Sequence, residues 1–471
     1  MNRRFAIAPL LACSVLTAGC GVLEPRLPTA EPSIPAAWPI PPQTVPALSA
    51  AAAADGSTTD IGWRDFFVEP RLRQVIALAL ENNRDLRVAV LNVQRAQALY
   101  RVQRADRVPS LDANGTWIRT GGDGPLSDSY TATVGITDFE LDLFGRVRNL
   151  SDAALQRYFA QEAARRSAQL ALIAETATAY LTLAADQEQL RVVQETLRTR
   201  EEFHQITEKR YQIGAVSALD VSQSLTQVEA ARADVARYAG QVAQSGNALQ
   251  LLVGAPVPRE LLPTDFGTSL TGLAPLPTGT PSGVLLRRPD VMQAEHQLRA
   301  ANANIGAARA AFFPSITLTG SAGYASDQLS SLFEASTYAW AFVPQVKLPI
   351  FQGGRLTANL AVATADRDIA LARYESAIQA AFSEVADALA LTATLDAQRA
   401  ARQATVNAAT AADALSRVRY NAGRDSYLVL LESQRSLYLA QQFLIVTQLA
   451  EQTNRINLYK ALGGGWKEGG S

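Results

Sequence analysis

The chain has 471 residues, and its 43 lysines and arginines nearly balance its 44 aspartates and glutamates, which gives a net charge of −1. This balance excludes the basic footprint of a nucleic-acid-binding protein. The two cysteines, Cys13 and Cys20, lie near the start of the chain, and the two histidines, His204 and His296, are far apart. These counts disfavour a disulfide framework, a metal site and a histidine-based catalytic centre, so we predict no catalytic residues and no metal ligands.

Residues 1–19 have the features of a signal peptide. Two arginines precede an apolar stretch at residues 5–16, which is too short to span a bilayer as a helix. The stretch ends in Leu16-Thr17-Ala18-Gly19-Cys20, which is similar to the bacterial lipobox, so we predict cleavage before Cys20 and a covalent lipid on its thiol. Gly21 follows where the inner-membrane retention signal has aspartate, and this favours the outer membrane. The alternative is an ordinary secretory signal that contains a cysteine by chance.

After Cys20 the chain begins with a proline-rich segment that is predicted to be extended, and it continues as two copies of one pattern. Tyr211 and Tyr420 are 209 residues apart, and so are Gly214 and Gly423. An internal repeat of this length constrains the whole architecture. The predicted parts are a lipidated N-terminus at 20–62, repeat one at 63–252, a linker at 253–289, repeat two at 290–462 and a disordered tail at 463–471.

Each copy is predicted to contain a helix, two strands, a long helix, a turn and a second helix. Residues 152–211 contain no proline or glycine, and a helix of this length would be about 90 Å long. Copy two has the equivalent helix at 356–420. Helices this long must pack along one another. The predicted coiled-coil seam of the first has seven-residue spacing and consists of Leu183, Leu190, Leu197, His204 and Tyr211.

Four shorter segments alternate apolar and polar residues, at 110–117, 130–137, 315–324 and 338–342, which predicts strands. No stretch of about 18 apolar residues without charges follows the signal peptide, so no spanning helix is predicted. One apolar face with aromatic residues and one polar face are typical of an outer-membrane β-barrel. A half-buried sheet in a soluble protein has the same alternation. The lipobox and the long helices that flank both hairpins favour the barrel.

A sheet in lipid must close into a barrel, because unpaired backbone groups cannot end in hydrocarbon. Four strands are too few to close, since known barrels begin at about eight strands. Several chains must therefore share their strands, and a dimer would supply about eight strands and a trimer about twelve. This reasoning excludes only the monomer.

Four dispersed motifs stand in a fixed order along the chain: Trp63-Arg64-Asp65-Phe66-Phe67, Asp142-Leu143-Phe144-Gly145-Arg146, Pro349-Ile350-Phe351-Gln352-Gly353-Gly354 and Asn457-Leu458-Tyr459-Lys460-Ala461-Leu462-Gly463-Gly464-Gly465-Trp466. With these motifs the chain resembles the TolC-type outer-membrane efflux proteins, in particular their OprM-like lipoprotein branch, over nearly all of its mature length. The resemblance implies a mixed α+β membrane protein that is mostly α, with long antiparallel coiled-coil helices and four strands per chain. Its trimer would build a barrel of about twelve strands that continues as a helical tunnel into the periplasm.

The function that this resemblance implies is a passive exit duct, lipid-anchored in the outer membrane, for drugs or other small molecules. Its implied partners are two further copies of the chain, a periplasmic adaptor protein and an inner-membrane pump of the resistance-nodulation-division type. The only cofactor implied is the lipid on Cys20. The sequence does not specify the cargo, although two methionines give no support for a soft-metal pathway.

The same resemblance implies where the tunnel closes. Leu428, Glu432 and Arg435 share one face at the start of the last helix. Leu428 would form an apolar constriction, and Glu432 and Arg435 would form an ionic ring between neighbouring helices; the usual acid in the family is aspartate. Gly214 and Gly423 would form the turns at the tunnel tip. The alternative for Glu432 and Arg435 is an ordinary exposed ion pair worth about 0.3–0.5 kcal/mol.

Two other classes of function fit the sequence less well. An enzyme would need convergent reactive groups, and the glycines at 463–465 lack the Lys-Ser/Thr that follows in a phosphate-binding loop. A periplasmic coiled-coil lipoprotein without a pore would explain the helices and Cys20. It would not explain two amphipathic hairpins at equivalent positions.

Overall fold

The computed structural model describes residues 23–31, 34–35, 38, 61–267, 272–274 and 282–464. The chain divides into two compact units, and each unit takes pieces from both halves of the sequence. Unit 1 consists of Met1–Pro32, Leu91–Ala163 and Met292–Ala377, and unit 2 of Ser33–Val90, Ala164–Val291 and Ile378–Ser471. The predicted signal peptide at 1–19, Cys20 and the tail from residue 465 lie outside the described residues.

The two longest helices have the same length and occupy equivalent positions in the sequence. α6 and α10 each have 67 residues, or about 100 Å at 1.5 Å per residue. In chain order the elements are α3 (Trp63–Phe66), α4 (Pro70–Asn82), α5 (Arg84–Ala105), β1 (Asp112–Thr120), β2 (Ser127–Leu141), α6 (Arg146–Gln212), α7 (Ala218–Val253), η3 (Arg259–Leu261), η4 (Ser282–Arg287), α9 (Pro289–Ala310), β3 (Ser315–Ser326), η5 (Leu329–Ser331), η6 (Ala335–Thr337), β4 (Tyr338–Lys347), α10 (Arg355–Asn421) and α11 (Tyr427–Ala461).

α6 begins six residues before its predicted start at residue 152, because the chain just before it favours helix initiation. Gly145 has a φ of +76°, a left-handed conformation that glycine adopts without strain. The Asp142 carboxylate accepts a hydrogen bond of 2.6 Å from the backbone N–H of Arg148, in the first turn. This contact satisfies one of the N–H groups that a helix start leaves without a partner.

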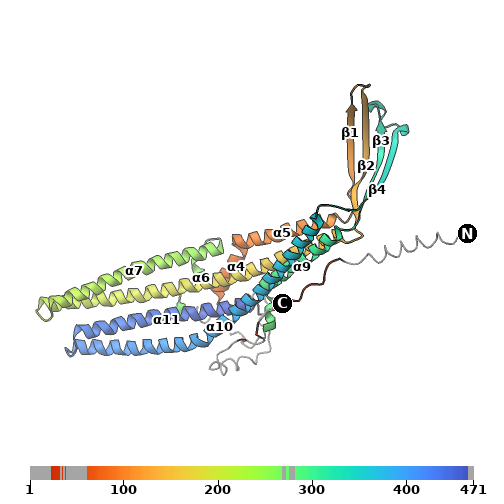
Figure 1. Ribbon diagram of the computed structural model, residues 1–471. Helices are drawn as coiled ribbons and strands as arrows, with labels where there is room; N and C mark the ends of the chain where they lie inside the picture. The colour runs from red at the N-terminus through yellow and green to blue at the C-terminus, as the bar shows by residue number, and fades with distance from the viewer. Residues whose placement is uncertain are drawn as a thin grey trace. The chain divides into compact units, whose positions relative to one another are not determined.

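In unit 1 the four strands form one antiparallel sheet in the order β1-β2-β3-β4 (Figure 1). One face carries the cross-strand aromatic pairs Trp117–Tyr130 and Tyr324–Tyr338, and the other carries mostly small polar residues. Trp117 is 60% exposed, so the chain itself does not cover the aromatic face. This arrangement confirms the predicted alternation. β1 and β4 each have one edge that no strand pairs within the described part of the chain.

A bulge in β2 keeps both faces of the sheet consistent. The register against β3 shifts between Ile136 and Phe139, where Thr137 and Asp138 together oppose a single residue. The extra residue places Ile136 and Phe139 on the same aromatic face. Strict alternation from Ile136 would instead put the carboxylates of Asp138 and Glu140 on that face. The sequence pattern ended at this point and did not predict the bulge.

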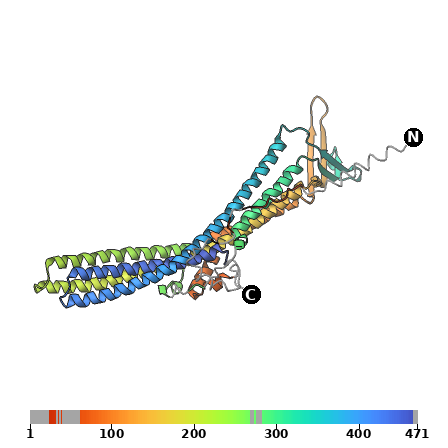
Figure 2. The same ribbon diagram turned by 60° about the horizontal axis from the view of Figure 1, so that its bottom comes forward.

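In unit 2 the long helices pair along their length. α7 lies along the C-terminal part of α6, and α11 lies along the C-terminal part of α10 (Figure 1, Figure 2). Each of these helix pairs turns back on itself in a short connection, at residues 213–217 and 422–426.

The aromatic motif at residues 63–67 belongs to the core of unit 2. Trp63, Phe66 and Phe67 are fully buried, and the Phe66 ring stacks on that of Tyr459 at 4.0 Å between centroids. The Tyr459 hydroxyl donates a hydrogen bond of 2.7 Å to the Ile61 carbonyl. Burial of each such ring contributes roughly 2–3 kcal/mol. The segment at 61–67 is thereby fixed to the end of α11.

One helix in the described residues, α6, contains an 18-residue window that is long and apolar enough to cross a membrane, with a mean hydropathy of 1.2. The sequence expectation of no spanning helix counted only windows without charges. In the structure 61% of this window is buried inside the chain. Leu172, Ile173 and Tyr180 of α6 belong to the core of unit 2. We therefore assign the window to helix packing.

The bulge yields a prediction about Asp138, which has a φ of +52°. Aspartate tolerates this left-handed conformation, whereas a β-branched side chain does not. We expect Asp138→Val to destabilise each subunit by about 1–2 kcal/mol, and Asp138→Gly to leave the stability unchanged or higher. The measurement is the temperature at which the purified oligomer dissociates on SDS gels. Equal dissociation temperatures for the two variants would show that the backbone of the bulge is not as described.

Candidate functional site: the helical tip, its cleft and the N-terminal strap

Two tight turns with the same geometry form the tip of unit 2. Gly214 and Gly423 have φ values of +76° and +68°. After α6, the Ala215 N–H donates to the Arg210 carbonyl at 2.8 Å, and after α10 the Arg424 N–H donates to the Arg419 carbonyl at 2.9 Å. This bond across six residues is the Schellman pattern, which needs glycine in the left-handed position. Both predicted turn glycines therefore end a long helix.

The helices that follow the two turns start differently. α7 begins with a capping box, in which the Ser217 hydroxyl accepts from the Asp220 N–H and the Asp220 carboxylate accepts from the Ser217 N–H. Ser426 precedes α11 as its N-cap residue, and its side chain makes no capping hydrogen bond. Instead Arg419 donates two hydrogen bonds, of 2.7 and 2.8 Å, to the Asp425 carboxylate across the turn. These bonds hold the pKa of the Asp425 carboxyl below its usual value.

An aromatic cluster joins the two helix pairs near the tip. The Phe203 ring of α6 stacks on Tyr427 of α11 at 4.8 Å and lies 5.5 Å from Tyr420 of α10. The guanidinium of Arg210 lies 5.3 Å from the Tyr420 ring centroid. Burial raises the pKa of the Tyr427 hydroxyl to about 12. The sequence analysis missed this cluster, because its members come from three helices and share no spacing.

The predicted coiled-coil seam is only one of two seven-residue series in the core. Leu183 is 2% exposed, but Tyr211, at the other end of the predicted seam, is 49% exposed. A second series is more consistently buried and consists of Asp186, Val193, Arg200 and Thr207. Two such series, three and four residues apart, are what a coiled coil requires. Leucines are conspicuous in a sequence, so the prediction found the series that contains them.

The three predicted gate residues face away from the rest of the chain. Leu428 is 65% exposed, and the side chains of Glu432 and Arg435 are 66% and 64% exposed. Arg435 Nε lies 3.6 Å from Glu432 Oε2, as an i, i+3 pair on α11. An exposed pair of this kind contributes little to stability on its own. The three side chains are available for contacts with neighbouring copies.

Each histidine makes a hydrogen bond to a polar side chain of a neighbouring helix. His204 Nδ1 is 2.7 Å from the Ser224 hydroxyl, and His296 Nδ1 is 2.8 Å from the Gln156 carboxamide oxygen. The two lie in different units. Within the described residues no group of three or more His, Cys, Asp or Glu side chains could hold a metal ion.

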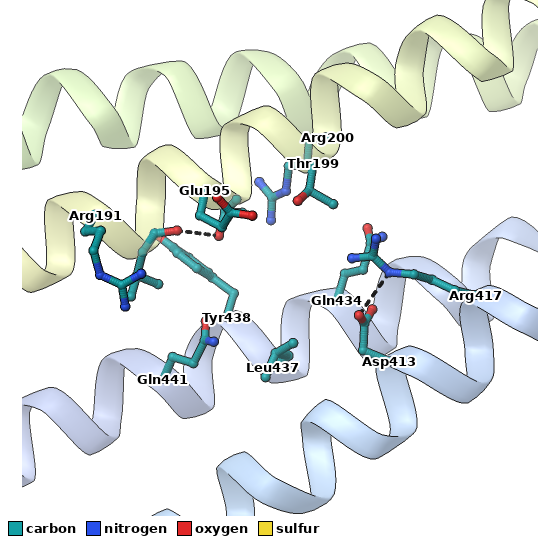
Figure 3. Close-up of a pocket in the computed structure, with 12 residues that line it drawn as sticks. Arg191, Glu195, Thr199, Arg200, Asp413, Arg417, Gln434, Leu437, Tyr438 and Gln441 are labelled. Carbon is teal, nitrogen blue, oxygen red and sulfur yellow. Dashed lines mark hydrogen bonds and ion pairs between the residues drawn. The ribbon is translucent and has the colours of Figure 1, made fainter.

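A cleft of about 240 Å³ lies between α6, α10 and α11 (Figure 3). Arg200 is 8% exposed, and its guanidinium lies 5.7 Å from the centroid of the Tyr438 ring. Its Nη1 donates to the Gln227 carbonyl at 3.1 Å, and its Nε is buried without a hydrogen-bond partner. On the opposite side Asp413 accepts from Arg417 Nε at 3.0 Å through one oxygen, while its other oxygen, Oδ1, is buried without a partner. Burial lowers the pKa of Arg200.

Residues 23–31, here called the N-terminal strap, contact α9 and α10 within unit 1. Arg309 Nη1 donates to the Leu23 carbonyl at 3.2 Å, and Asn302 Nδ2 donates to the Pro25 carbonyl at 2.8 Å. The Glu31 N–H donates to Glu375 Oε1 at 3.2 Å. Since α9 ends at Ala310 and β3 follows closely, the start of the strap lies at the strand end of α9.

Comparisons with known proteins agree with this architecture. A family model described as outer membrane efflux protein matches residues 75–255 and 280–464. The chain is 46% identical over 432 residues to the probable efflux pump outer membrane protein TtgC of Pseudomonas putida, covering 90% of this chain and 89% of the relative. It is 44% identical over 431 residues to the outer membrane protein OprJ of Pseudomonas aeruginosa, covering 90% of each.

Solved structures give the same result. The open state of the MtrE outer membrane channel from Neisseria gonorrhoeae is similar with a TM-score of 0.86 and 38% identity, covering 96% of this chain and 100% of that one. CusC, whose structures concern folding and transmembrane channel formation, is similar with a TM-score of 0.81 and 40% identity, covering 93% and 99%. The predicted fold class is therefore confirmed, and so is the resemblance read from the motifs.

The cleft yields a prediction about Arg200. Arg200 is a buried charge whose Nε has no hydrogen-bond partner and whose contacts include the Gln227 carbonyl and the Tyr438 ring, so a methionine of similar length should be favourable. We expect Arg200→Met to raise the free energy of unfolding by about 1–3 kcal/mol. The neighbouring Arg198→Met, at an exposed ion pair with Glu195, should leave it nearly unchanged. Denaturant unfolding followed by circular dichroism tests both, and a loss of stability in Arg200→Met would contradict the prediction.

Proposed function

This chain belongs to the outer membrane efflux protein family, and on that premise we propose that it forms the exit duct of a tripartite efflux pump. It is an outer-membrane channel with a helical periplasmic part, and it is not an enzyme. The proposed assembly contains three copies of the chain, a periplasmic adaptor protein and an inner-membrane pump of the resistance-nodulation-division type. The duct is passive, and the pump supplies the energy.

The observation that carries this proposal is the four-stranded sheet with two free edges and one exposed aromatic face. In lipid both edges must find strand partners. Three copies would supply about twelve strands, which is within the range of known outer-membrane barrels. The aromatic face then contacts lipid, and the polar face lines the pore.

Relatives of this chain indicate a class of cargo. They include an antibiotic efflux pump outer membrane protein, ArpC, and a toluene efflux pump outer membrane protein, TtgC, both from Pseudomonas putida. We propose that this duct likewise passes apolar drugs or organic solvents. Because the pump would select the cargo, the duct itself needs only a wide polar lumen. The polar face of the sheet would line such a lumen.

The gate is proposed at Leu428, Glu432 and Arg435. Their side chains are exposed at the start of α11, where neighbouring copies would meet around a common axis. Leu428 would form the apolar constriction. Arg435 pairs only weakly within its own helix, at 3.6 Å, so its guanidinium is available to a carboxylate of a neighbouring copy.

A lipid on Cys20 is supported by the position of the strap. Leu23 contacts Arg309 at the strand end of α9. Three residues of chain span at most about 10 Å, so acyl chains attached to Cys20 would be tethered near the segment that precedes β3. Such a tether would let the acyl chains insert into the bilayer.

The proposed gate predicts a leak when its ionic part is removed. We expect the double variant Glu432→Ala/Arg435→Ala to raise single-channel conductance in planar bilayers severalfold, because the ion pairs between copies are lost. Glu195→Ala/Arg198→Ala, at an exposed i, i+3 pair on α6, serves as the matched control and should not change conductance. Wild-type conductance in the gate variant would remove these two residues from the gate.

The proposed anchor predicts a covalent lipid on one cysteine only. Cells fed labelled palmitate should label the wild-type protein and Cys13→Ser, whose cysteine lies in the predicted signal peptide. Cys20→Ser should take up no label and should be released from membranes more readily, because each buried methylene contributes about 0.8 kcal/mol to anchoring. Labelled Cys20→Ser protein would place the lipid elsewhere.

A further inference from the structure

We propose that Leu348, Ile350 and Phe351, which join β4 to α10 and are here called the rim segment, contact phospholipid acyl chains at the inner boundary of the bilayer. These residues lie outside the strands, so no strand pairing accounts for them. They are 54%, 91% and 88% exposed in the chain. The proposal uses the family membership and the orientation of the aromatic face towards lipid. It does not depend on the gate or on Cys20.

The alternation of β4 continues into the rim segment. From Tyr338 to Val346 every second residue lies on the aromatic face and is paired in register with β3. The next two positions of the same series, Leu348 and Ile350, are also large and apolar. The residue between Val346 and Leu348 is Lys347, which pairs with Ser315 on the polar face. The lipid-facing series therefore extends past the last ladder hydrogen bond.

The other long hairpin supports this assignment. Phe139 and Leu141 lie 209 residues before Leu348 and Ile350, and both still belong to β2. They pair in register with Leu318 and Ile316 on the aromatic face. Equivalent positions that precede α6 are thus on the lipid side of the sheet. The same side is assigned to Leu348 and Ile350, which precede α10.

The thickness of the bilayer requires residues beyond the strand. Eight steps from Tyr338 to Val346 cover about 26 Å along the strand at about 3.3 Å per residue. A strand tilt of about 40° reduces this to about 20 Å along the membrane normal, less than the apolar band of about 25 Å. Twelve steps to Ile350 give about 30 Å on the same basis. The band can therefore be covered on this strand only if the rim segment takes part.

Phe351 stands where the first copy has a carboxylate that caps the following helix. Its equivalent before α6 is Asp142, which accepts the N–H of Arg148 in the first helical turn. A phenyl ring cannot accept this bond, and loss of a cap typically costs about 1 kcal/mol. Because the ring is 88% exposed, contacts within the described chain do not compensate for that loss. The described chain therefore gives the ring little packing of its own, and an exposed aromatic ring favours the membrane interface.

A second copy of the chain is the competing occupant, and sheet geometry argues against it. A neighbouring copy must join the free edge of β4 in the plane of the sheet, where the backbone groups point. Side chains stand roughly perpendicular to that plane. Ile350, on the aromatic face, is therefore directed towards whatever surrounds the barrel. In an outer membrane that is lipid.

Site-directed spin labelling of the full-length oligomer in phospholipid bilayers tests the proposal. The sequence contains no cysteine after Cys20, so Leu348→Cys, Ile350→Cys and Phe351→Cys each introduce one new site. Val346→Cys serves as the lipid-facing control and Gln345→Cys as the pore-facing control. We expect labels on the rim segment to collide with molecular oxygen several times more often than with a water-soluble nickel complex, as at Val346.

Two other results would overturn the proposal. High collision rates with the nickel complex, as at Gln345, would place the rim segment in water. Low rates with both reagents would place it in the interface between copies. Labelling of the wild-type protein gives an independent check, because a reactive Cys20 thiol would count against the lipid anchor and leave the rim segment unaffected. Phe351→Asp, which restores the carboxylate found before α6, should raise helix content in detergent and lower retention in bilayers.

Discussion

Hydrocarbon allows no unpaired backbone groups, and this requirement determines most of the architecture. The chain offers four strands whose outer edges, on β1 and β4, have no partner in the part that the structure describes. A single copy therefore cannot exist in a bilayer with its sheet intact. Copies must share one wall, and whatever follows each hairpin is then repeated around the same axis. The 67-residue helices that follow β2 and β4 are therefore also repeated around this axis, and together they form a tunnel.

Packing along the helices is not uniform, and the difference has consequences for function. The core of unit 2 that contains Trp63, Phe66 and Tyr459 is aromatic and fully buried. Towards the tip, the buried series on α6 includes Arg200 and Thr207, and the small cluster of Phe203, Tyr420, Tyr427 and Leu430 supplies apolar packing. The proposed gate therefore lies at the end with the smaller apolar core. Local opening is expected where buried apolar contacts are fewest.

Much of this could be read from the sequence, and the failures have physical causes. The alternation of the strands and the turn glycines Gly214 and Gly423 were predicted because each depends on local chemistry. The bulge at Asp138 was not, since an extra residue is visible only against a partner strand. The cluster of Phe203, Tyr420 and Tyr427 comes from three helices, so no spacing reveals it. The predicted seam named Leu197 and His204 rather than Arg200, because an arginine in a core position resembles a surface residue.

The two halves of the chain act as an internal comparison, since equivalent positions share a backbone and differ in surroundings. Both copies keep a glycine directly before the long helix, ahead of Arg146 and of Arg355, because the backbone there is left-handed. At other equivalent positions the two copies have different residues, and local stability alone does not explain the difference. A capping box starts α7 but not α11, and Asp142 caps α6 where α10 has Phe351. At α11 the Arg419–Asp425 pair takes the place of the cap within the chain, whereas the exposed Phe351 ring before α10 replaces no hydrogen bond. Divergence between equivalent positions is therefore informative where the described chain offers no substitute of its own, as at Phe351.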